Sequence, residues 1–296
     1  MVFLKFLNKR KMTLVTSLNQ PLVSIGVPVY NGEVDIGLAL DCLLSQTYAN
    51  LEIIISDNAS TDRTDEVCRQ YAGRDRRIIY IRQPVNLGAT ENFAFVLNRA
   101  RGEYFMWAAA DDTRSSGFVE CNLNFLRQHS DYAGSTSPVI LAGESFKREV
   151  MGDCSLDGDK EARFVGFFKC WHSNGRFYSL FRKDVVDNCV ISKSYLGSDW
   201  AIVLAVLSQG KLNCIDAGEV VLGRNGASKN DQFFKKSRSQ WYEYIFPFYK
   251  LSMFVIEASK EFSPVNRIRL ICMMIKFNFL ANAVRFKLVI LRIKNI

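Results

Sequence analysis

The sequence has little histidine and no paired cysteine motif. Only His129 and His172 occur in 296 residues, and their spacing is not that of a zinc site. None of the eight cysteines belongs to a C-x-x-C pair, and most have apolar neighbours. Buried free thiols in a reducing compartment explain this pattern better than a disulfide framework. We therefore expect neither a zinc site nor disulfide bonds.

The sequence also lacks the apolar segments that would direct it into a membrane. No uncharged run approaches the length that spans a bilayer. Lys5 and the basic run Lys9–Lys11 interrupt the stretch where a signal peptide would be apolar. We expect a cytoplasmic protein.

Acidic residues are absent from both ends of the chain. Residues 1–20 carry four cations and residues 262–296 carry seven, whereas the net charge of the whole chain is only +8. The body between these ends is therefore acidic. This distribution argues against a nucleic-acid groove along the body, and it predicts a loosely ordered basic arm over residues 1–20.

Apolar runs and helix-like segments alternate in the first half of the chain. This alternation predicts an α/β fold with a mostly parallel central sheet and helices on both of its faces. Pro28 has no N–H and should end the ladder of the first strand. Ser60 or Thr61 should cap a helix that ends near residue 72. The other expected elements are strands at 22–29, 51–56, 77–82 and 104–110 and helices at about 33–46 and 90–101.

Two adjacent carboxylates, Asp111 and Asp112, follow the strand expected over 104–110. Like charges at the end of a buried strand need solvent, a cation or a partner. One interpretation is a divalent-metal site that holds a phosphorylated ligand. The other is a helix cap, in which Asp112 or Thr113 begins a helix over 115–128.

Three of the expected strands end in polar pairs, namely Tyr30-Asn31, Asp57-Asn58 and Asp111-Asp112. Because parallel strands end at one edge of a sheet, these pairs should line a common ligand crevice. Neither G-x-G-x-x-G nor G-x-x-x-x-G-K-[ST] occurs. Phosphate charge would then be neutralised by a metal on carboxylates, which favours a nucleoside-diphosphate ligand.

The segments SIGVPVYNG, EIIISDNASTDRT, NLG and YFMWAAADD occur in this order between Leu22 and Thr113. Together they resemble glycosyltransferase family 2, which has the GT-A fold, and a weaker resemblance continues to about Ser228. The resemblance implies a nucleotide-sugar donor and a divalent metal, Mg²⁺ or Mn²⁺, held by Asp111 and Asp112. Ala109 stands where the family often has a further acid. The implied nucleotide-binding residues are Pro28, Tyr30, Asn31, Asp57, Asn58, Asp111 and Arg224.

Asp199 precedes an apolar helix that runs through Leu207. By structure alone, Asp199 would be an N-cap. In the family, an acid at the head of this helix is the catalytic base, so the resemblance implies that role for Asp199, although Ser198 replaces the first member of the usual Glu-Asp pair. Arg224 lies in a segment that resembles the loop over the diphosphate, and the alternative there is a solvated glycine turn.

The second half is less regular than the first. We expect strands at 132–141 and 177–181 and a polar loop at 143–163. A GT-A catalytic domain would cover 21–232, with a nucleotide-binding half at about 21–113 and an acceptor half at about 114–232. Residues 233–296 would form an aromatic and basic helical extension. That extension either contacts an anionic membrane or packs on the catalytic domain with its basic face in water.

The function implied by the resemblance is an inverting glycosyltransferase. It would move a sugar from a nucleotide-diphosphate sugar to a saccharide or lipid-linked oligosaccharide in cell-surface polysaccharide synthesis, such as O-antigen or capsule. One alternative is a weak or inactive membrane-associated protein that binds nucleotide sugars, suggested by Ala109 and Ser198. A sugar nucleotidyltransferase would need a loop rich in glycine and basic residues after the first strand, and VPVYNGEVD is not such a loop.

Overall fold

The computed structural model describes residues 20–142, 154–169, 175–189, 195–223 and 240–294, with side chains as far as Asn282. In this part of the chain a seven-stranded sheet has the order β3-β2-β1-β4-β8-β6-β9, and only β8 runs antiparallel to its neighbours. The mostly parallel α/β sheet that we expected is confirmed. Its strands are β1 Val23–Val29, β2 Leu51–Asp57, β3 Ile78–Arg82, β4 Tyr104–Trp107, β6 Tyr132–Thr136, β8 Leu180–Arg182 and β9 Lys211–Cys214.

A smaller sheet is built from three short strands in the order β5-β10-β7. Two differences from the sequence prediction arise here. The strand expected over 132–141 is two strands, β6 and β7, that belong to different sheets. The strand expected over 177–181 is instead a 3-10 helix, η1, followed by β8. The bounds are β5 Thr113–Arg114, β7 Val139–Leu141, β10 Val220–Leu222 and η1 Gly175–Tyr178.

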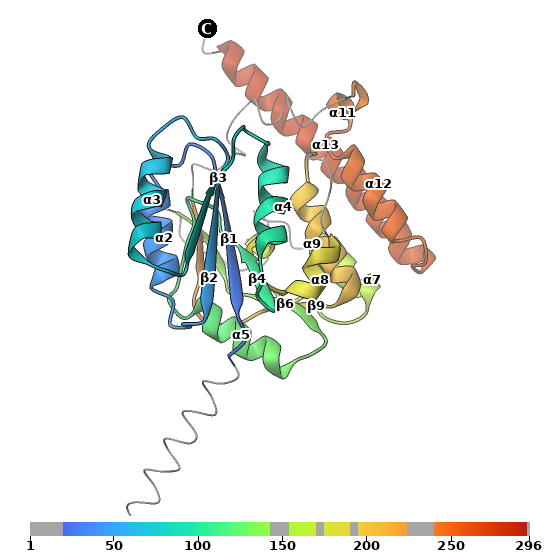
Figure 1. The fold of residues 1–296 in the computed structure, drawn as a ribbon. Helices are drawn as coiled ribbons and strands as arrows, with labels where there is room; N and C mark the ends of the chain where they lie inside the picture. The colour runs from blue at the N-terminus through green and yellow to red at the C-terminus, as the bar shows by residue number, and fades with distance from the viewer. Residues whose placement is uncertain (1–19, 143–153, 170–174, 190–194, 224–239, 295–296) are drawn as a thin grey trace, which may run out of the picture.

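Helices cover both faces of the central sheet (Figure 1). Successive strand residues face opposite sides, so Ile54 and Trp107 belong to one apolar cluster whereas Ile53 and Met106 belong to the other. The second cluster is closed by α2 Ile36–Leu44, α3 Thr64–Arg74 and α5 Phe118–Gln128. The first is closed by α4 Ala89–Arg99, α7 Lys160–Lys169 and α9 Ser198–Gln209, and the short α8 Lys183–Val186 and η2 Asp187–Cys189 lie beside it.

Pro28 ends one ladder of β1 and leaves the other intact. The Gly26 carbonyl accepts from the N–H of Ala108, so the even-numbered residues of β1 face β4. Pairing with β4 ends at Gly26 opposite Trp107, whereas pairing with β2 continues to Val29 opposite Asp57. The missing N–H of Pro28 therefore lies on the β4 side, where the ladder stops, and the ladder to β2 is unaffected.

Two predicted helix caps are wrong. α3 begins at Thr64 without a side-chain cap, and neither Ser60 nor Thr61 caps it. α5 begins at Phe118 after Gly117, and Thr113 lies in β5. Asp112 is therefore not a helix cap, so the capping interpretation of the paired carboxylates is excluded. The loop expected over 143–163 is replaced by α7 from Lys160 onward, and residues 143–153 lie outside the described part.

The C-terminal extension is helical and packs on the α/β body. It contains α11 Tyr242–Ile245, α12 Tyr249–Ala258 and α13 Pro264–Lys294. The ring of Trp200 on α9 stacks on Phe248 at 5.5 Å between centroids, and Phe277 of α13 meets the same ring edge-on. Leu270 and Met274 of α13 are buried in the apolar cluster that contains α7 and α9. The extension is therefore part of the folded body up to that point.

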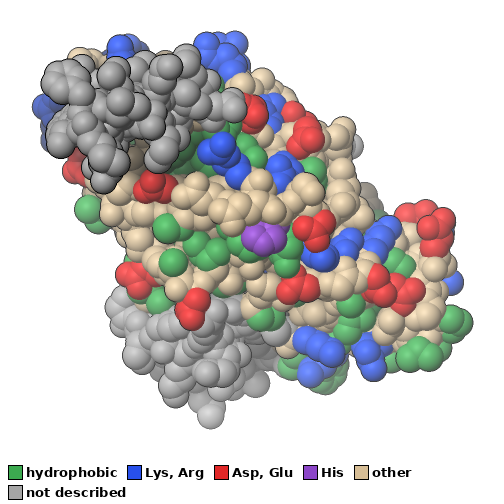
Figure 2. Space-filling view, turned by 90° about the horizontal axis from the view of Figure 1, so that it is seen from below, with side chains coloured by type: hydrophobic (Ala, Val, Ile, Leu, Met, Phe, Trp, Pro, Cys, Tyr) green, Lys and Arg blue, Asp and Glu red, His purple; other side chains and the backbone are tan. Residues whose placement is uncertain are grey.

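One face of the described surface has charges of both signs and no groove lined by charges of a single sign (Figure 2). Figure 2 views the molecule from below, and acidic and basic side chains are interspersed there without a broad area of one sign. The described cysteines are all free thiols. Within the described segments, no helix is both long and apolar enough to cross a bilayer.

Substituting Leu270 should test the packing of α13. Leu270 is fully buried, whereas Ile268 on the same helix is 62% exposed. Leu270→Ala should lower the free energy of unfolding by about 2–5 kcal/mol, because it removes buried methyl groups and leaves a cavity. Ile268→Ala, the matched control, should change it by about 0.5 kcal/mol or less. Urea unfolding of both variants measures this, and equal losses would contradict the packing.

Candidate active site

The carboxyl ends of β1, β2 and β4 meet at one edge of the sheet (Figure 1). Val29 pairs with Asp57, and Gly26 pairs with Trp107 four residues before Asp111. The polar pairs that follow the three strands therefore lie along a single edge, as parallel pairing requires. Tyr30 is half exposed there, whereas Asp57 and Asn58 are buried.

The Asp111–Asp112 turn is covered by the end of β10. The N–H of Gly223 donates to Asp112 Oδ1 at 2.9 Å. A Cβ atom on Gly223 would collide with the carbonyl oxygen and the carboxylate of Asp111, so only glycine fits this close approach. Two segments more than a hundred residues apart in sequence therefore form one unit. The sequence offered no signal for this contact beyond the glycine itself.

The carboxylate of Asp112 is buried, and only one of its two oxygens accepts a hydrogen bond from the described residues. Burial raises its pKa from 3.8 to about 6, although the Gly223 N–H and the charge of Arg114 both favour the ionised form. Among the described residues, Asp112 Oδ2 has no hydrogen-bond partner. An orphaned carboxylate oxygen beside a second carboxylate suits a divalent cation, so Asp111 and Asp112 fit the expected metal. The described residues contain no cluster of three or more candidate ligands.

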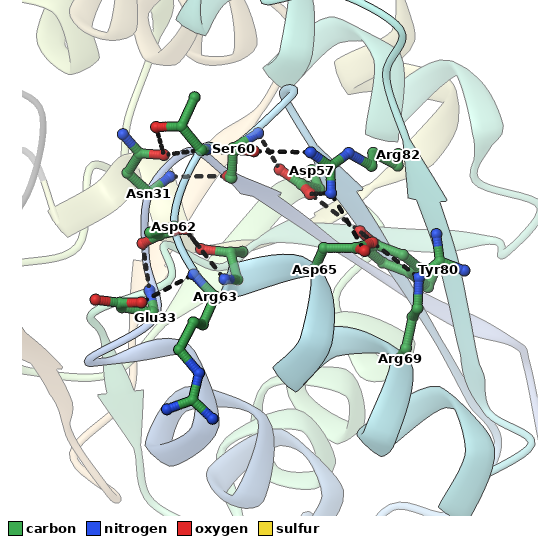
Figure 3. A network of polar contacts seen from close by, with 12 residues as sticks. Asn31, Glu33, Asp57, Ser60, Asp62, Arg63, Asp65, Arg69, Tyr80 and Arg82 are labelled. Carbon is green, nitrogen blue, oxygen red and sulfur yellow. Dashed lines mark hydrogen bonds and ion pairs between the residues drawn. The ribbon is translucent and has the colours of Figure 1, made fainter.

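Asp57 is the centre of a polar network (Figure 3). Its Oδ1 accepts from the N–H of Ser60 at 2.9 Å, and its Oδ2 accepts from the Tyr80 hydroxyl at 3.0 Å. The same hydroxyl donates to Asp65, and this bond is the largest of the effects that lower the pKa of Asp65. Arg82 lies 3.2 Å from Asp65 and 3.9 Å from Asp57. The network holds the loop after β2 at the edge of the site.

Asn31 and Asn58 are engaged with backbone. Asn31 has a φ of 52°, and its Oδ1 accepts from the N–H of Thr61 at 2.8 Å. Asn58 Oδ1 accepts from the N–H of Leu87, and its Nδ2 donates to the Gly88 carbonyl. These amides shape the loops beside the site. The side chain of Tyr30 is exposed, whereas the amides of Asn31 and Asn58 already bind backbone, so Tyr30 can contact a nucleotide more readily than they can.

Asp199 lies in the first turn of α9 and does not serve as its N-cap, a position taken by Gly197 in a left-handed conformation. Tyr178 of η1 is near enough to this acid and to the metal candidates for the charges of all three to act on its hydroxyl. Burial raises the Tyr178 pKa well above its ordinary value, and the charges of Asp112, Asp199 and Asp111 add to this in that order. η1 packs against both β4 and α9, which explains the position. Sequence reasoning did not identify Tyr178.

Phe177, the residue before Tyr178, packs against neighbouring aromatic rings. Phe177 stacks on Trp107 of β4 with 4.6 Å between centroids and planes 7° apart. The ring of Phe177 also meets Tyr178 edge-on at 5.3 Å. Tyr178 is therefore positioned by packing against the strand that carries the paired aspartates. Arg224 and Asn225 lie outside the described residues.

Comparison with known proteins identifies the family. The model of glycosyl transferase family 2 matches residues 24–189, which is more than half of the chain. The chain therefore belongs to glycosyltransferase family 2, and the resemblance seen in the sequence is confirmed.

Two relatives illustrate the range of the match. An uncharacterised glycosyltransferase from Haemophilus influenzae is 33% identical over 122 residues, covering 39% of this chain and 49% of the relative. The GalNAc(5)-diNAcBac-PP-undecaprenol beta-1,3-glucosyltransferase of Campylobacter jejuni is 27% identical over 180 residues, covering 60% of this chain and 57% of the relative. The chain thus spans about half the length of these two relatives.

Solved structures share the GT-A fold at low sequence identity. Staphylococcus aureus TarS 1-349 in complex with UDP-GlcNAc has a TM-score of 0.65 at 14% identity, covering 86% of this chain and 71% of that one. The mannosyltransferase PcManGT from Pyrobaculum calidifontis, in complex with GDP-Man and Mn²⁺, has a TM-score of 0.54 at 16% identity, covering 90% and 76%.

The raised pKa of Asp112 predicts a pH effect on stability. Because the native carboxyl holds its proton more tightly than the unfolded chain does, its stabilising contribution is present below about pH 4 and is lost as the pH rises to about 6. Without metal, the unfolding free energy of the wild type relative to Asp112→Asn should fall over this range by up to about 3 kcal/mol. Above pH 6, excess Mn²⁺ should raise the unfolding free energy of the wild type but not that of Asp112→Asn. If the difference in unfolding free energy between the two proteins does not change with pH, the burial of the Asp112 charge is contradicted.

Tyr80→Phe should loosen the network around Asp57. The variant removes one donor shared by Asp57 and Asp65, which should cost about 1–3 kcal/mol and weaken nucleotide binding. Tyr71→Phe is the matched control, since the Tyr71 hydroxyl donates to Asp41 on α2. Urea unfolding and titration with UDP and GDP measure both effects. Equal nucleotide affinities in the two variants would show that the network does not serve the site.

Proposed function

We propose that this chain is an inverting glycosyltransferase that moves a sugar from a nucleotide-diphosphate sugar to an acceptor hydroxyl. The unpartnered buried oxygen of Asp112, beside Asp111 at the carboxyl edge of the sheet, carries this proposal. A bound divalent metal, Mg²⁺ or Mn²⁺, would neutralise diphosphate charge and stabilise the leaving group. Asp111 and Asp112 would hold it. The complexes of TarS with UDP-GlcNAc and of PcManGT with GDP-Man support a nucleotide-sugar donor.

The donor nucleotide would lie along the edge formed by the ends of β1 and β2. The exposed ring of Tyr30 offers a face on which a base can stack. Asp57, Asn31 and Asn58 hold the surrounding loops through the bonds described above, so we assign them a role in shaping the nucleotide site. Pro28 lies near the end of β1 before Tyr30, where we propose that it borders the nucleotide. Arg224 remains a proposed contact of the diphosphate.

Asp199 would act as the general base. It would take the proton of the acceptor hydroxyl as that oxygen bonds to the anomeric carbon, while the bond from this carbon to the diphosphate breaks on the opposite face. A single displacement of this kind inverts the anomeric centre. The packing of η1 against both α9 and β4, with the charges of Asp199 and the paired aspartates acting on Tyr178, supports a reaction centre in that region.

A lipid-linked oligosaccharide or another saccharide is the proposed acceptor, in synthesis of a cell-surface polysaccharide of the O-antigen or capsule type. The name of the Campylobacter jejuni relative describes an undecaprenol-linked saccharide, which supports this choice. We propose accordingly that the chain acts in the cytoplasm, where it can reach a lipid-linked acceptor at the inner face of the cell membrane.

A second candidate is a nucleotide-sugar-binding protein with weak or no transfer activity. Two departures favour it, since Ala109 and Ser198 stand where the family usually has acids. Donor hydrolysis without an acceptor separates the two, because only an active transferase breaks the bond from sugar to diphosphate.

Asp199→Asn tests the proposed base. The variant keeps the shape of the side chain but cannot accept a proton, so transfer should fall by about 10²–10⁴-fold while donor affinity is retained. Glu120→Gln is the matched control, because Glu120 is an acid in the first turn of α5. Product formation and calorimetric donor binding measure the two effects. Normal turnover in Asp199→Asn would place the base elsewhere, and absent turnover in the wild type would favour the binding protein.

A further inference from the structure

Helix α13 has two apolar faces, and the core covers only one of them. Leu270 and Met274 point into the cluster around α7 and α9. On the opposite side a second stripe recurs every three or four residues and stays in solvent, with Ile275 65% and Phe279 72% exposed. Its members are Val265, Ile268, Cys272, Ile275 and Phe279. A helix that is apolar on both sides is normally buried on both sides, so this stripe calls for a partner.

Helix α11 extends the stripe with aromatic side chains. Nδ2 of Asn282 on α13 donates to the Ile245 carbonyl, so the two helices lie side by side, as Figure 1 also shows. Trp241, just before α11, is 74% exposed, and Tyr244 and Phe246 are exposed beside it. We name the surface formed by Trp241, Tyr244, Ile245, Phe246, Ile275 and Phe279 the α11–α13 face.

Among the described side chains, the charges that flank the exposed stripe of α13 are positive. Arg269 and Lys276 flank the exposed stripe of α13, and residues 262–296 contain seven cations and no acid. Two acids of the preceding helices are already paired, since Glu243 binds Lys250 and Glu257 binds Lys260. Glu261 lies at the turn into α13, at the far end from α11. The uncompensated positive charge therefore accompanies the apolar stripe.

We propose that the α11–α13 face binds the interface of an anionic lipid bilayer. Apolar side chains would enter the interface, Trp and Tyr suit its boundary, and the cations would meet lipid headgroups. A second copy of this chain is the competing occupant, but a symmetric pairing of this face would bring two sets of cations together. Charge complementarity thus selects the lipid surface. The proposal does not depend on the proposed transfer reaction.

The packing of α13 gives the contact a mechanical consequence. Because Leu270 and Met274 anchor α13 to the cluster that contains α9, a membrane held by the outer stripe would also hold the catalytic domain. The two alternatives expected for the extension are therefore compatible, since one face packs on the core while the other meets lipid. The contact should weaken with salt, because screening shortens the range of the cations.

Co-sedimentation of the full-length chain with vesicles tests the proposal. The vesicles are phosphatidylcholine with or without one quarter phosphatidylglycerol, at low and high salt. The wild type should bind only the anionic vesicles, and at low salt only. Ile275→Ser combined with Phe279→Ser should weaken this binding at least about tenfold. Leu38→Ser combined with Val85→Ser is the matched control, because both residues are exposed apolar side chains elsewhere, and it should bind like the wild type.

Urea unfolding of the double variants, expected to match the wild type, shows that any loss of binding is local. Wild-type protein that ignores anionic vesicles at low salt overturns the proposal, as does equal binding by the two double variants. Light scattering without lipid measures whether the chain is a monomer or a dimer. A wild-type dimer that Ile275→Ser with Phe279→Ser converts to a monomer would assign the face to a second copy and would also overturn the lipid proposal.

Discussion

The parallel pairing of β1 with both β2 and β4 is the constraint on which the rest of the structure depends. It aligns Val29 with Asp57 and Gly26 with Trp107, so the chain emerges from all three strands at one edge. The main-chain hydrogen bonds of these buried strands have no alternative partners, which makes the register costly to change. The polar residues at this edge are therefore brought together by the backbone, before any of their side chains interact.

A buried charge is the second feature that organises the site. Asp112 is kept out of water by β10 and Gly223, and its attraction to Arg114 only partly offsets the desolvation that raises its pKa. Proteins retain such unfavourable groups mainly where they serve a function. The stacking of Phe177 on Trp107 holds the neighbouring Tyr178, whose pKa is raised by burial and by the charges of Asp112 and Asp199.

The C-terminal extension links the catalytic domain to a surface of different chemistry. One side of α13 shares the core with α7 and α9, and the other presents apolar side chains between cations. Sequence periodicity alone could not separate these two sides, because apolar residues occur around the whole helix. The packing of Leu270 and Met274 against α7 and α9 distinguishes the buried side of α13 from the exposed one.

The sequence by itself determined the alternation of strands and helices, the polar pairs at the strand ends and the family, because local apolar patterning and short motifs carry that information. Only the tertiary structure decided that Asp112 is no helix cap, that Asn58 and Asn31 bind backbone, and that the charges of Asp112, Asp199 and Asp111 all act on Tyr178. It also decided that 132–141 contributes to two different sheets. These features depend on contacts between segments far apart in the chain, such as Gly223 with Asp112, which no local pattern encodes.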